Sequence, residues 1–414
     1  MSARVQPKPT PDIILLATTL ILLGLGVDMV YSASFVLAQS TFLVKQVIMA
    51  GIGVTVMIAF AALGYHWLER LSVPIMIVAV ISLLAVLVPG MSADKYGAHR
   101  WLGMPGLLEF QPSEFTKLAL IIYMSAWLAR KGQHVKELGS GFVPFAMILL
   151  AVTVLIMAEP DMGTAVVVAI TATFIFFVAG ANLLHLAVIG LAGLLGFAYL
   201  VVVAGYRQDR LAAFLNPWQD SLGTGWHTIQ TLIALGSGGV TGLGLGASRQ
   251  KFYYVPNAHT DAIFAIIGEE LGLVGAAVVI LLFAVLAWRG FTIAMRAPDA
   301  FGRLLATGVT CVILVQALVN IAVVTNSVPY TGITLPFISY GGSSLVVTLA
   351  AVGLLLAVSR HVGVVPATAR SKAELDEKSD GVVKMLRRKP SRPPMAASGA
   401  SFASRGRTRS SRRD

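Results

Sequence analysis

Charge and cysteine are both scarce in this chain. Asp, Glu, Lys and Arg make up 12% of its 414 residues, whereas hydrophobic residues make up 56% and the mean hydropathy is +0.79. A soluble domain carries roughly 25% charged residues, so this composition excludes an ordinary soluble protein. The single cysteine, Cys311, excludes a disulfide framework and a metal centre built from cysteines.

Apolar runs of membrane-spanning length are abundant instead. A helix needs roughly 17–25 mostly apolar residues to cross a bilayer. Runs near this length recur about ten times, at residues 13–31, 43–63, 73–89, 115–129, 142–158, 163–180, 183–204, 262–288, 304–326 and 342–359. The sequence therefore predicts an all-α polytopic integral membrane protein with about ten transmembrane helices.

The net charge of +11 is concentrated at the C-terminal end. From Arg360 onward, 14 Lys and Arg against 5 Asp and Glu leave +9. Because residues 361–414 are also rich in Pro, Ser and Ala, we expect this tail to be disordered. Its charge suits nucleic acid, anionic lipid or an acidic partner. The favoured interpretation is a basic cytoplasmic extension that helps to set the topology, with no nucleic acid partner expected.

The short loops predict the orientation. Placing residues 1–11 in the cytoplasm puts most of the short-loop Lys and Arg there too, which the positive-inside rule favours, and makes both termini cytoplasmic. The opposite face then carries segments 90–114, 159–162, 205–261 and 327–341. Long loops between membrane helices are functional or disordered. Within the largest loop, residues 228–235 suit a short helix at the membrane interface.

Three carboxylates near the eighth apolar run raise the question of function. Asp261 stands where the chain enters this run from outside, and Glu269 and Glu270 lie within it. Carboxylates at membrane depth are costly and mark functional sites. Asp261 also suits a simple helix cap. Glu269 and Glu270 lie roughly 12–13 Å deeper and point about 100° apart, so we expect them to be structural, one of them pairing with a cation or a helix end.

Three further polar patches fall on the same predicted face. Glu114 and Lys117, three residues apart, share one helix face and form either a plain ion pair or a cation presented to a phosphate. Glu159 and Asp161 share a tight turn, where Asp161 is interpreted as structural. Prolines and glycines in 327–341 interrupt the chain before the last run. The convergence of these patches with Asp261 on one side of the membrane predicts the functional site.

The same segments resemble the SEDS family, the FtsW and RodA proteins of bacterial division and elongation. The matching motifs, in chain order, are YSAS (31–34), HRWLG (99–103), QPSEFTKL (111–118), EPDMGT (159–164), AHTD (258–261), IIGEELG (266–272) and TLPFISYGGSS (334–344). The resemblance covers residues 12–360, interpreted as one transmembrane domain. Within the family, IIGEELG and TLPFISYGGSS look more like the division member, FtsW.

The resemblance implies a ten-helix peptidoglycan glycosyltransferase that polymerises lipid II into glycan strands at the extracytoplasmic face during cell division. It implies that Asp261 is catalytic, together with Glu114 and Lys117. It further implies a class B penicillin-binding protein and other division proteins as partners, and the bacterial inner membrane at the septum as the location. The chain departs from many division members just before the AHTD motif, where Tyr253, Tyr254 and Asn257 stand in a run that carries acids in those members.

The chemistry of such a transfer suits these residues. A hydroxyl nucleophile benefits from a carboxylate base, so we expect Asp261 to deprotonate the lipid II acceptor in an inverting transfer from the lipid-linked nascent glycan strand. The departing lipid diphosphate needs cationic and polar groups. The candidate substrate-binding residues are Arg100, Trp101, Arg210, Arg249, Lys251, His259, Ser339 and Ser343. No cofactor is required by the sequence, and a divalent cation, Mg²⁺ or Mn²⁺, at Asp261 or Glu114 stays open.

Two other functions remain as alternatives. A lipid II flippase would use the same lipid-binding surfaces, but it should place polar residues through the whole membrane thickness, whereas here most gather at the outer face. A non-catalytic division scaffold would use the basic tail as its contact, and it leaves Asp261, Glu114 and Lys117 without a task.

Overall fold

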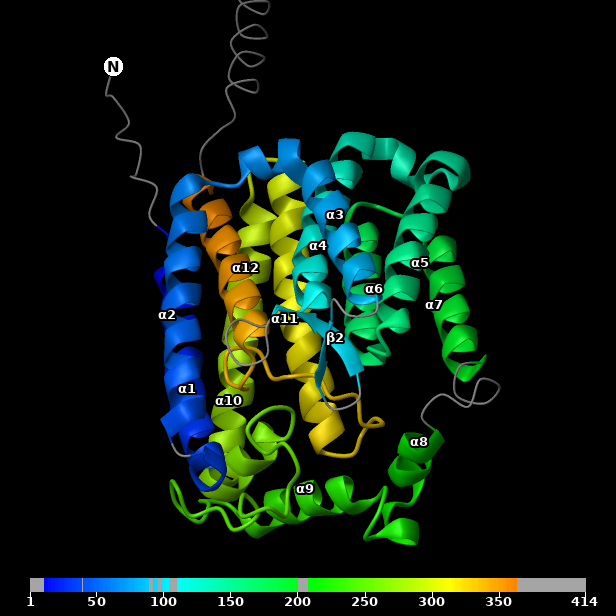
Figure 1. The fold of residues 1–414 in the computed structure, drawn as a ribbon. Coiled ribbons are helices and arrows are strands. Elements are labelled where there is room, and N and C mark those ends of the chain that lie inside the picture. Colours follow the sequence, from blue (N-terminus) through cyan, green and yellow to red (C-terminus); the bar gives the residue numbers. More distant parts are fainter. Residues whose placement is uncertain are drawn as a thin grey trace, which may run out of the picture. The chain divides into compact units, whose positions relative to one another are not determined.

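Helices make up nearly all of the regular structure (Figure 1). The computed structural model describes residues 11–38, 40–88, 92–95, 98–103, 110–199 and 208–362. All of these belong to one structural unit, residues 1–364. The predicted cytoplasmic segment 1–11 and the basic tail 361–414 lie almost entirely outside the described residues.

Each predicted apolar run coincides with a helix, one of which is interrupted, and this confirms the fold class. The helices are α1 (Ile13–Ala38), α2 (Ser40–Leu63), α3 (His66–Val86), α4 (Pro112–Lys131), α5 (Val143–Ala158), α6 (Met162–Val178), α7 (Leu183–Ala198), α10 (Ile263–Arg296), α11 (Ala300–Val324) and α12 (Gly342–His361). By length and composition, seven helices among the described residues suit a membrane crossing, and α6 and α7 are apolar but shorter. Helix α4 is more polar because it carries charged residues near both ends.

The connecting segments contain structure that an all-α prediction did not include. Strands β1 (Ser92–Lys95) and β2 (Ala98–Leu102) form an antiparallel hairpin in which Ser92 pairs with Leu102. The largest loop contains α8 (Gln208–Leu215), the 3₁₀ turn η4 (Pro217–Asp220) and α9 (Trp226–Ser237). Helix α9 confirms the short helix expected at residues 228–235. The remaining short elements, η1 (Gly132–Lys136) and η2 (Leu138–Phe142), join α4 to α5.

Helices α11 and α12 form the centre of the bundle, and small residues let their neighbours approach closely. Both are far more buried than the other long apolar helices. A Cβ on Gly353 of α12 would lie 2.5 Å from the Met57 carbonyl oxygen on α2, and one on Gly308 of α11 would lie 2.6 Å from side-chain atoms of Ile121 and Ile175. Because lipid provides little hydrophobic force between helices, such close packing is a main source of association.

Helix α10 is broken at Gly272, so the prediction of one continuous span over 262–288 is wrong at this point. Gly272 has φ 65° and ψ −165°, which only glycine adopts readily. The large loop enters the break: Leu243 N donates to Glu269 O over 3.0 Å, and Leu273 N donates to Gly239 O over 2.9 Å. These bonds satisfy backbone groups that the break would otherwise leave unpaired. Glu269 and Glu270 therefore lie in a short helical segment beside the loop.

Candidate functional site

Asp261 lies immediately before α10, but its side chain does not cap that helix. The capping residue is Ala262, and no side-chain hydrogen bond caps the helix. The Asp261 carboxylate instead accepts hydrogen bonds from Thr260 Oγ1, over 2.9 Å, and from the Tyr330 hydroxyl group. Asn320 Nδ2 on α11 donates to the Asp261 carbonyl oxygen over 2.8 Å. The explanation of Asp261 as a helix cap is thus wrong, because its carboxylate binds two hydroxyl groups and no backbone N–H of α10.

Two residues of the large loop pack around Tyr330. The His227 ring on α9 lies with its centroid 4.4 Å from that of Tyr330. The Arg210 guanidinium carbon lies 4.7 Å from the Tyr330 ring centroid, and Arg210 Nη1 donates to the Tyr330 carbonyl oxygen over 3.0 Å. The large loop is therefore closed over the segment before α12, and it places a cation beside the Asp261 site.

His259 is held in an aromatic cluster with Phe42 of α2 and Tyr340. The ring centroids of Phe42 and His259 are 4.6 Å apart, and those of Phe42 and Tyr340 are 5.0 Å apart. Tyr340 N also donates to the His259 carbonyl oxygen over 2.9 Å. Burial holds the pKa of His259 below its ordinary value, although the negative charge of Asp261 acts in the opposite direction. The cluster joins the start of α2 to the loop that carries Asp261.

Glu114 and Lys117 form a buried ion pair, as their spacing indicated. Both Glu114 oxygens lie 2.8 Å from Lys117 Nζ, and each residue is 6% exposed. Lys117 Nζ also donates to Gln316 Oε1 on α11 over 2.6 Å. Gln316 Nε2 donates in turn to the Thr334 carbonyl oxygen over 3.1 Å. The ion pair is therefore fixed to the segment before α12 through one amide side chain.

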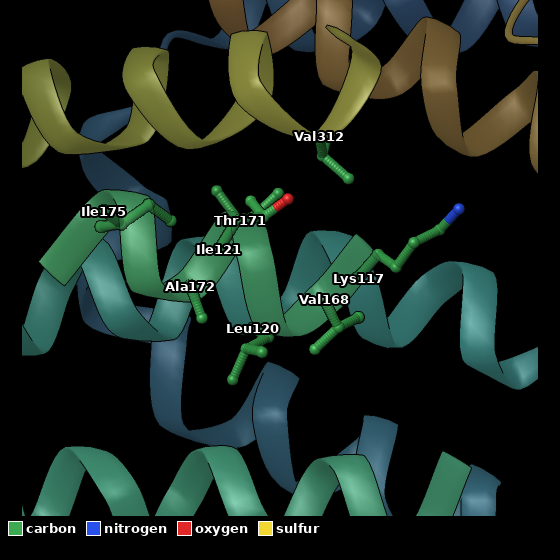
Figure 2. Close-up of a pocket in the computed structure, with 8 residues that line it drawn as sticks. All are labelled: Lys117, Leu120, Ile121, Val168, Thr171, Ala172, Ile175 and Val312. Carbon is green, nitrogen blue, oxygen red and sulfur yellow. The ribbon is translucent and has the colours of Figure 1, made fainter. Parts of the chain in front are cut away.

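The Lys117 side chain lines two crevices. One, of about 320 Å³ including space open to the outside, has Glu114, Gln316 and Pro336 in its walls. The other, of about 210 Å³ on the same measure, is lined mainly by apolar residues of α4, α6 and α11 (Figure 2). In Figure 2 the Lys117 nitrogen points away from these apolar side chains. The first crevice thus combines charge with an apolar wall.

Helix α11 links Asp261 to the ion pair. Gln316 and Asn320 are one turn apart, and both reach the segment before α12. Asn320 Nδ2 binds the Ile333 carbonyl oxygen over 2.7 Å in addition to that of Asp261. One face of α11 thus positions the catalytic candidates Asp261 and Lys117 against the same stretch of backbone.

The turn between α5 and α6 joins this region through side chains that sequence analysis singled out. Asp161 caps α6 by accepting from Thr164 N over 3.1 Å, and it accepts from Gln111 Nε2 over 3.3 Å. Gln111 N donates to Ser343 Oγ over 3.2 Å. The start of α4, the α5–α6 turn and the start of α12 therefore meet, so the predicted convergence of the polar patches occurs in the fold.

Arg100 of β2 is bonded to the backbone of that turn. Its Nε donates to the Glu159 carbonyl oxygen over 2.9 Å, and its Nη2 donates to that of Pro160. Trp101, the next residue, is partly exposed. These contacts give Arg100 a role in fastening the hairpin to the turn.

Glu159 itself is a buried acid whose two carboxylate oxygens have no hydrogen-bond partner among the described residues. Burial raises its pKa to about 8; the charge of Asp161 adds to this rise, and that of Arg100 opposes it. The surroundings therefore favour the neutral, protonated form, whose burial costs far less than that of a charged carboxylate.

Lys251 and Arg249 differ in accessibility, and both are tied to the acids of α10. Lys251 Nζ lies 3.1 Å from Glu270 Oε1 in a buried ion pair, and Ser32 Oγ of α1 donates to the same carboxylate over 2.7 Å. Arg249 N donates to Glu269 Oε1 over 2.9 Å, and its side chain is exposed. Glu269 and Glu270 therefore hold the large loop against the bundle.

Ser339 is part of the turn before α12. Its Oγ accepts from Leu335 N over 2.7 Å, and its carbonyl oxygen accepts from Gln46 Nε2 over 3.4 Å. The side chain is 4% exposed. These two hydrogen bonds hold the turn before α12 in its conformation.

The acids of the site do not gather with other metal-binding side chains. Within the described part of the chain, no three His, Cys, Asp or Glu side chains are placed to hold a metal ion. Glu114 is neutralised by Lys117 at 2.8 Å. A divalent cation at Asp261 or Glu114 stays a prediction.

Sequence reasoning missed three residues of the Asp261 site. Tyr330, His227 and Asn320 each contact Asp261 or its partner Tyr330. They lie 34 to 69 residues from Asp261 along the chain, so no local spacing connects them to it. Only the polar character of Asn320 within an apolar run was a usable signal.

The fold and these contacts define a class: polytopic helical membrane proteins with a buried acid and a buried ion pair held together at one end of the bundle. Within that class, the FTSW_RODA_SPOVE family model, described as "Cell cycle protein", matches residues 13–363. The chain therefore belongs to the FtsW, RodA and SpoVE family.

Two relatives cover nearly the whole transmembrane domain. Stage V sporulation protein E of Bacillus subtilis is 46% identical over 360 residues, spanning 86% of this chain and 98% of its own. The probable peptidoglycan glycosyltransferase FtsW of Trichlorobacter lovleyi is 42% identical over 365 residues, spanning 87% and 96%.

Solved structures agree with this assignment. A chain from a structure described as "Structural coordination of polymerization and crosslinking by a peptidoglycan synthase complex" matches with a TM-score of 0.71 and 30% identity, over 86% of this chain and 99% of the other. The rod shape determining protein RodA of Thermus thermophilus matches with a TM-score of 0.64 and 28% identity, over 85% and 98%.

Proposed function

We propose that this chain is a peptidoglycan glycosyltransferase that polymerises lipid II at the extracytoplasmic face of the bacterial inner membrane during cell division. Relatives at 41–42% identity bear the name probable peptidoglycan glycosyltransferase FtsW. The observation that carries the proposal is the Asp261 carboxylate, which is 5% exposed, does not cap α10, and accepts hydrogen bonds from two side-chain hydroxyl groups.

In the proposed reaction, Asp261 acts as the general base. It removes the proton from the acceptor hydroxyl of lipid II while that oxygen bonds to the anomeric carbon of the lipid-linked glycan strand. The bond between this carbon and the diphosphate oxygen breaks, and its electron pair leaves with the lipid diphosphate. A single displacement of this kind inverts the anomeric carbon. General base catalysis contributes roughly 10²–10⁴ in rate.

The Glu114–Lys117 pair is the proposed charged wall of the site. Lys117 Nζ is oriented by Glu114 over 2.8 Å and by Gln316 over 2.6 Å, so its positive charge is already in place before substrate binds. Preorganised charge of this kind stabilises developing negative charge without reorganisation. The adjoining crevice, lined by Glu114, Lys117 and Gln316, offers a place for a substrate group.

A flippase remains the main alternative, and the contacts of α11 argue against it. Gln316 and Asn320 are the polar residues that would line part of a path through the membrane. Both amide groups are bonded to backbone oxygens of the segment before α12, at 3.1 and 2.7 Å. They therefore support the end of the bundle that holds Asp261.

The proposed partner is a class B penicillin-binding protein, with other division proteins at the septum. The structural relative from a peptidoglycan synthase complex supports a partner of this kind. Both termini are proposed to be cytoplasmic; the start of α1 and the end of α12 lie at the same end of the bundle, where Asp12 N donates to Ser359 Oγ over 3.1 Å, and the positive-inside rule favours the cytoplasm for that end.

The test is lipid II polymerisation by the purified protein with its transpeptidase partner, comparing wild type with Asp261→Asn. The amide keeps the shape of the side chain but cannot accept the proton. We expect polymer formation to fall roughly 10²–10⁴-fold while lipid II binding and thermal unfolding stay unchanged. Normal polymerisation by the variant would show that Asp261 is not the base.

A further inference from the structure

His227 has a ring nitrogen for which the protein provides no partner. Its Nε2 is buried and makes no hydrogen bond with any described residue. The ring is not loosely placed, because it packs against Tyr330 with centroids 4.4 Å apart. A buried nitrogen held in one orientation without a partner costs free energy, and binding sites are where such groups are found.

Two charged residues of opposite sign lie near His227. The positive charge of Arg210 and the negative charge of Asp261 both act on the imidazole. Arg210 packs against the same Tyr330 ring at 4.7 Å, while the Tyr330 hydroxyl group binds Asp261. Tyr330 thus carries the acid at its hydroxyl end and contacts Arg210 and His227 through its ring.

The surroundings of the imidazole also favour its neutral form, which donates one N–H. Burial is the largest effect and lowers the pKa of His227; the charge of Asp261 raises it, and the charge of Arg210 lowers it. A neutral imidazole N–H beside a guanidinium is a combination that binds phosphate oxygens, since the guanidinium supplies charge and the imidazole supplies direction.

We propose that His227 and Arg210 bind the diphosphate of the lipid-linked sugar donor, with His227 Nε2–H donating to a phosphate oxygen. The proposal rests on the proposed function and names the residues that receive its leaving group. Negative charge on the diphosphate grows as its bond to the sugar breaks, so a fixed N–H donor here stabilises the transition state more than the ground state.

The experiment measures binding of geranyl diphosphate to the full-length protein in lipid nanodiscs, with geraniol as the ligand that lacks the diphosphate. We expect saturable binding of the diphosphate to wild type and at least tenfold weaker binding of geraniol. The variant His227→Ala should bind the diphosphate about 10–100-fold more weakly, which is the effect of losing a hydrogen bond to a charged group. His227→Gln keeps an N–H donor and should recover most of the affinity.

Arg210→Gln should weaken diphosphate binding as well, without changing geraniol binding. The matched control is His134→Ala, whose side chain is 70% exposed on η1 and paired with Glu137; it should bind like wild type. Thermal unfolding of each variant shows whether it is folded. If His227→Ala is unstable, the diphosphate affinity of His227→Gln is used in its place.

Unchanged diphosphate affinity in folded His227→Ala overturns the proposal, as does equal loss in His227→Ala and His227→Gln, which would assign the effect to ring packing. Failure of wild type to bind the diphosphate overturns it too. If the protein does not polymerise lipid II but still binds geranyl diphosphate in a His227-dependent way, the proposed function fails and the diphosphate site stands.

Discussion

Tyr330 donates its hydroxyl hydrogen bond to Asp261 Oδ2, although 69 residues separate the two along the chain. Asn320 strengthens the same junction by binding the backbone oxygens of Asp261 and Ile333, at 2.8 and 2.7 Å. The carboxylate therefore lies between α10, α11 and the segment before α12. Its orientation depends on all three.

Removing the Tyr330 hydroxyl should reduce catalysis more than folding. Tyr330→Phe keeps the ring that packs on His227 and Arg210 but leaves Asp261 Oδ2 without this donor. A hydrogen bond to a charged group is worth about 1.5–3 kcal/mol, so we expect a 10–100-fold lower polymerisation rate with an unchanged melting temperature. The control is Tyr254→Phe, since Tyr254 is 51% exposed. A wild-type rate in Tyr330→Phe would remove Tyr330 from the site.

Breaking the Glu114–Lys117 pair should be costly because both side chains are buried. Lys117→Met leaves Glu114 without its cation in a site where it is 6% exposed. We expect a loss of about 3–5 kcal/mol in unfolding free energy together with loss of polymerisation.

The double variant Glu114→Gln with Lys117→Met separates stability from activity. Without the unpaired charge, stability should return toward wild type while activity stays absent, because the positive charge of Lys117 is still missing. Unfolding in denaturant and lipid II polymerisation measure the two effects. Recovery of activity in the double variant would reduce the pair to a structural role.

Gly272 should tolerate no side chain. It has φ 65°, and a Cβ there would lie 2.5 Å from the Val240 carbonyl oxygen and closer still to Gly242 N. We expect Gly272→Ala to destabilise the protein by at least about 1–3 kcal/mol and to increase proteolysis of the large loop. Gly193→Ala on α7 is the control, because no atom lies within 4 Å of its Cβ position. Equal melting temperatures for both variants would contradict the tight fit at the break.

Stability should fall as pH rises through the range set by Glu159. Its pKa is raised from 4.5 to about 8 in the folded protein, so between these values the folded state keeps a proton that the unfolded state has released. Unfolding free energy then decreases with rising pH, by up to about 1.4 kcal/mol per pH unit, and levels off above about pH 8.

Glu159→Gln should remove this pH dependence and make the protein more stable than wild type at pH 8. The exposed Glu137→Gln serves as the control and should leave the pH dependence intact. Melting temperatures between pH 5 and pH 9 provide the comparison. An unchanged slope in Glu159→Gln would assign the effect to another group.

Some of the site was predictable because its determinants are local. Glu114 and Lys117 are one helical turn apart, so their spacing alone indicated a pair, and the pair forms. The second partner of Lys117 is Gln316, which lies 199 residues away along the chain. No local pattern in the sequence predicts this contact. The contacts of Arg100 with backbone oxygens of the α5–α6 turn, and of Lys251 with the Glu270 carboxylate, likewise follow from no local pattern.

The sequence by itself determined the membrane-spanning helices, because the length of an apolar run is a local property and decides directly whether a helix can cross a bilayer. It also placed the polar residues at the ends of those helices. Only the tertiary structure decided that α10 breaks at Gly272, that Asp261 does not cap it, and that Tyr330 and His227 complete its surroundings. Those outcomes depend on contacts between distant segments, which hydrogen-bond satisfaction and close packing settle once the whole bundle has formed.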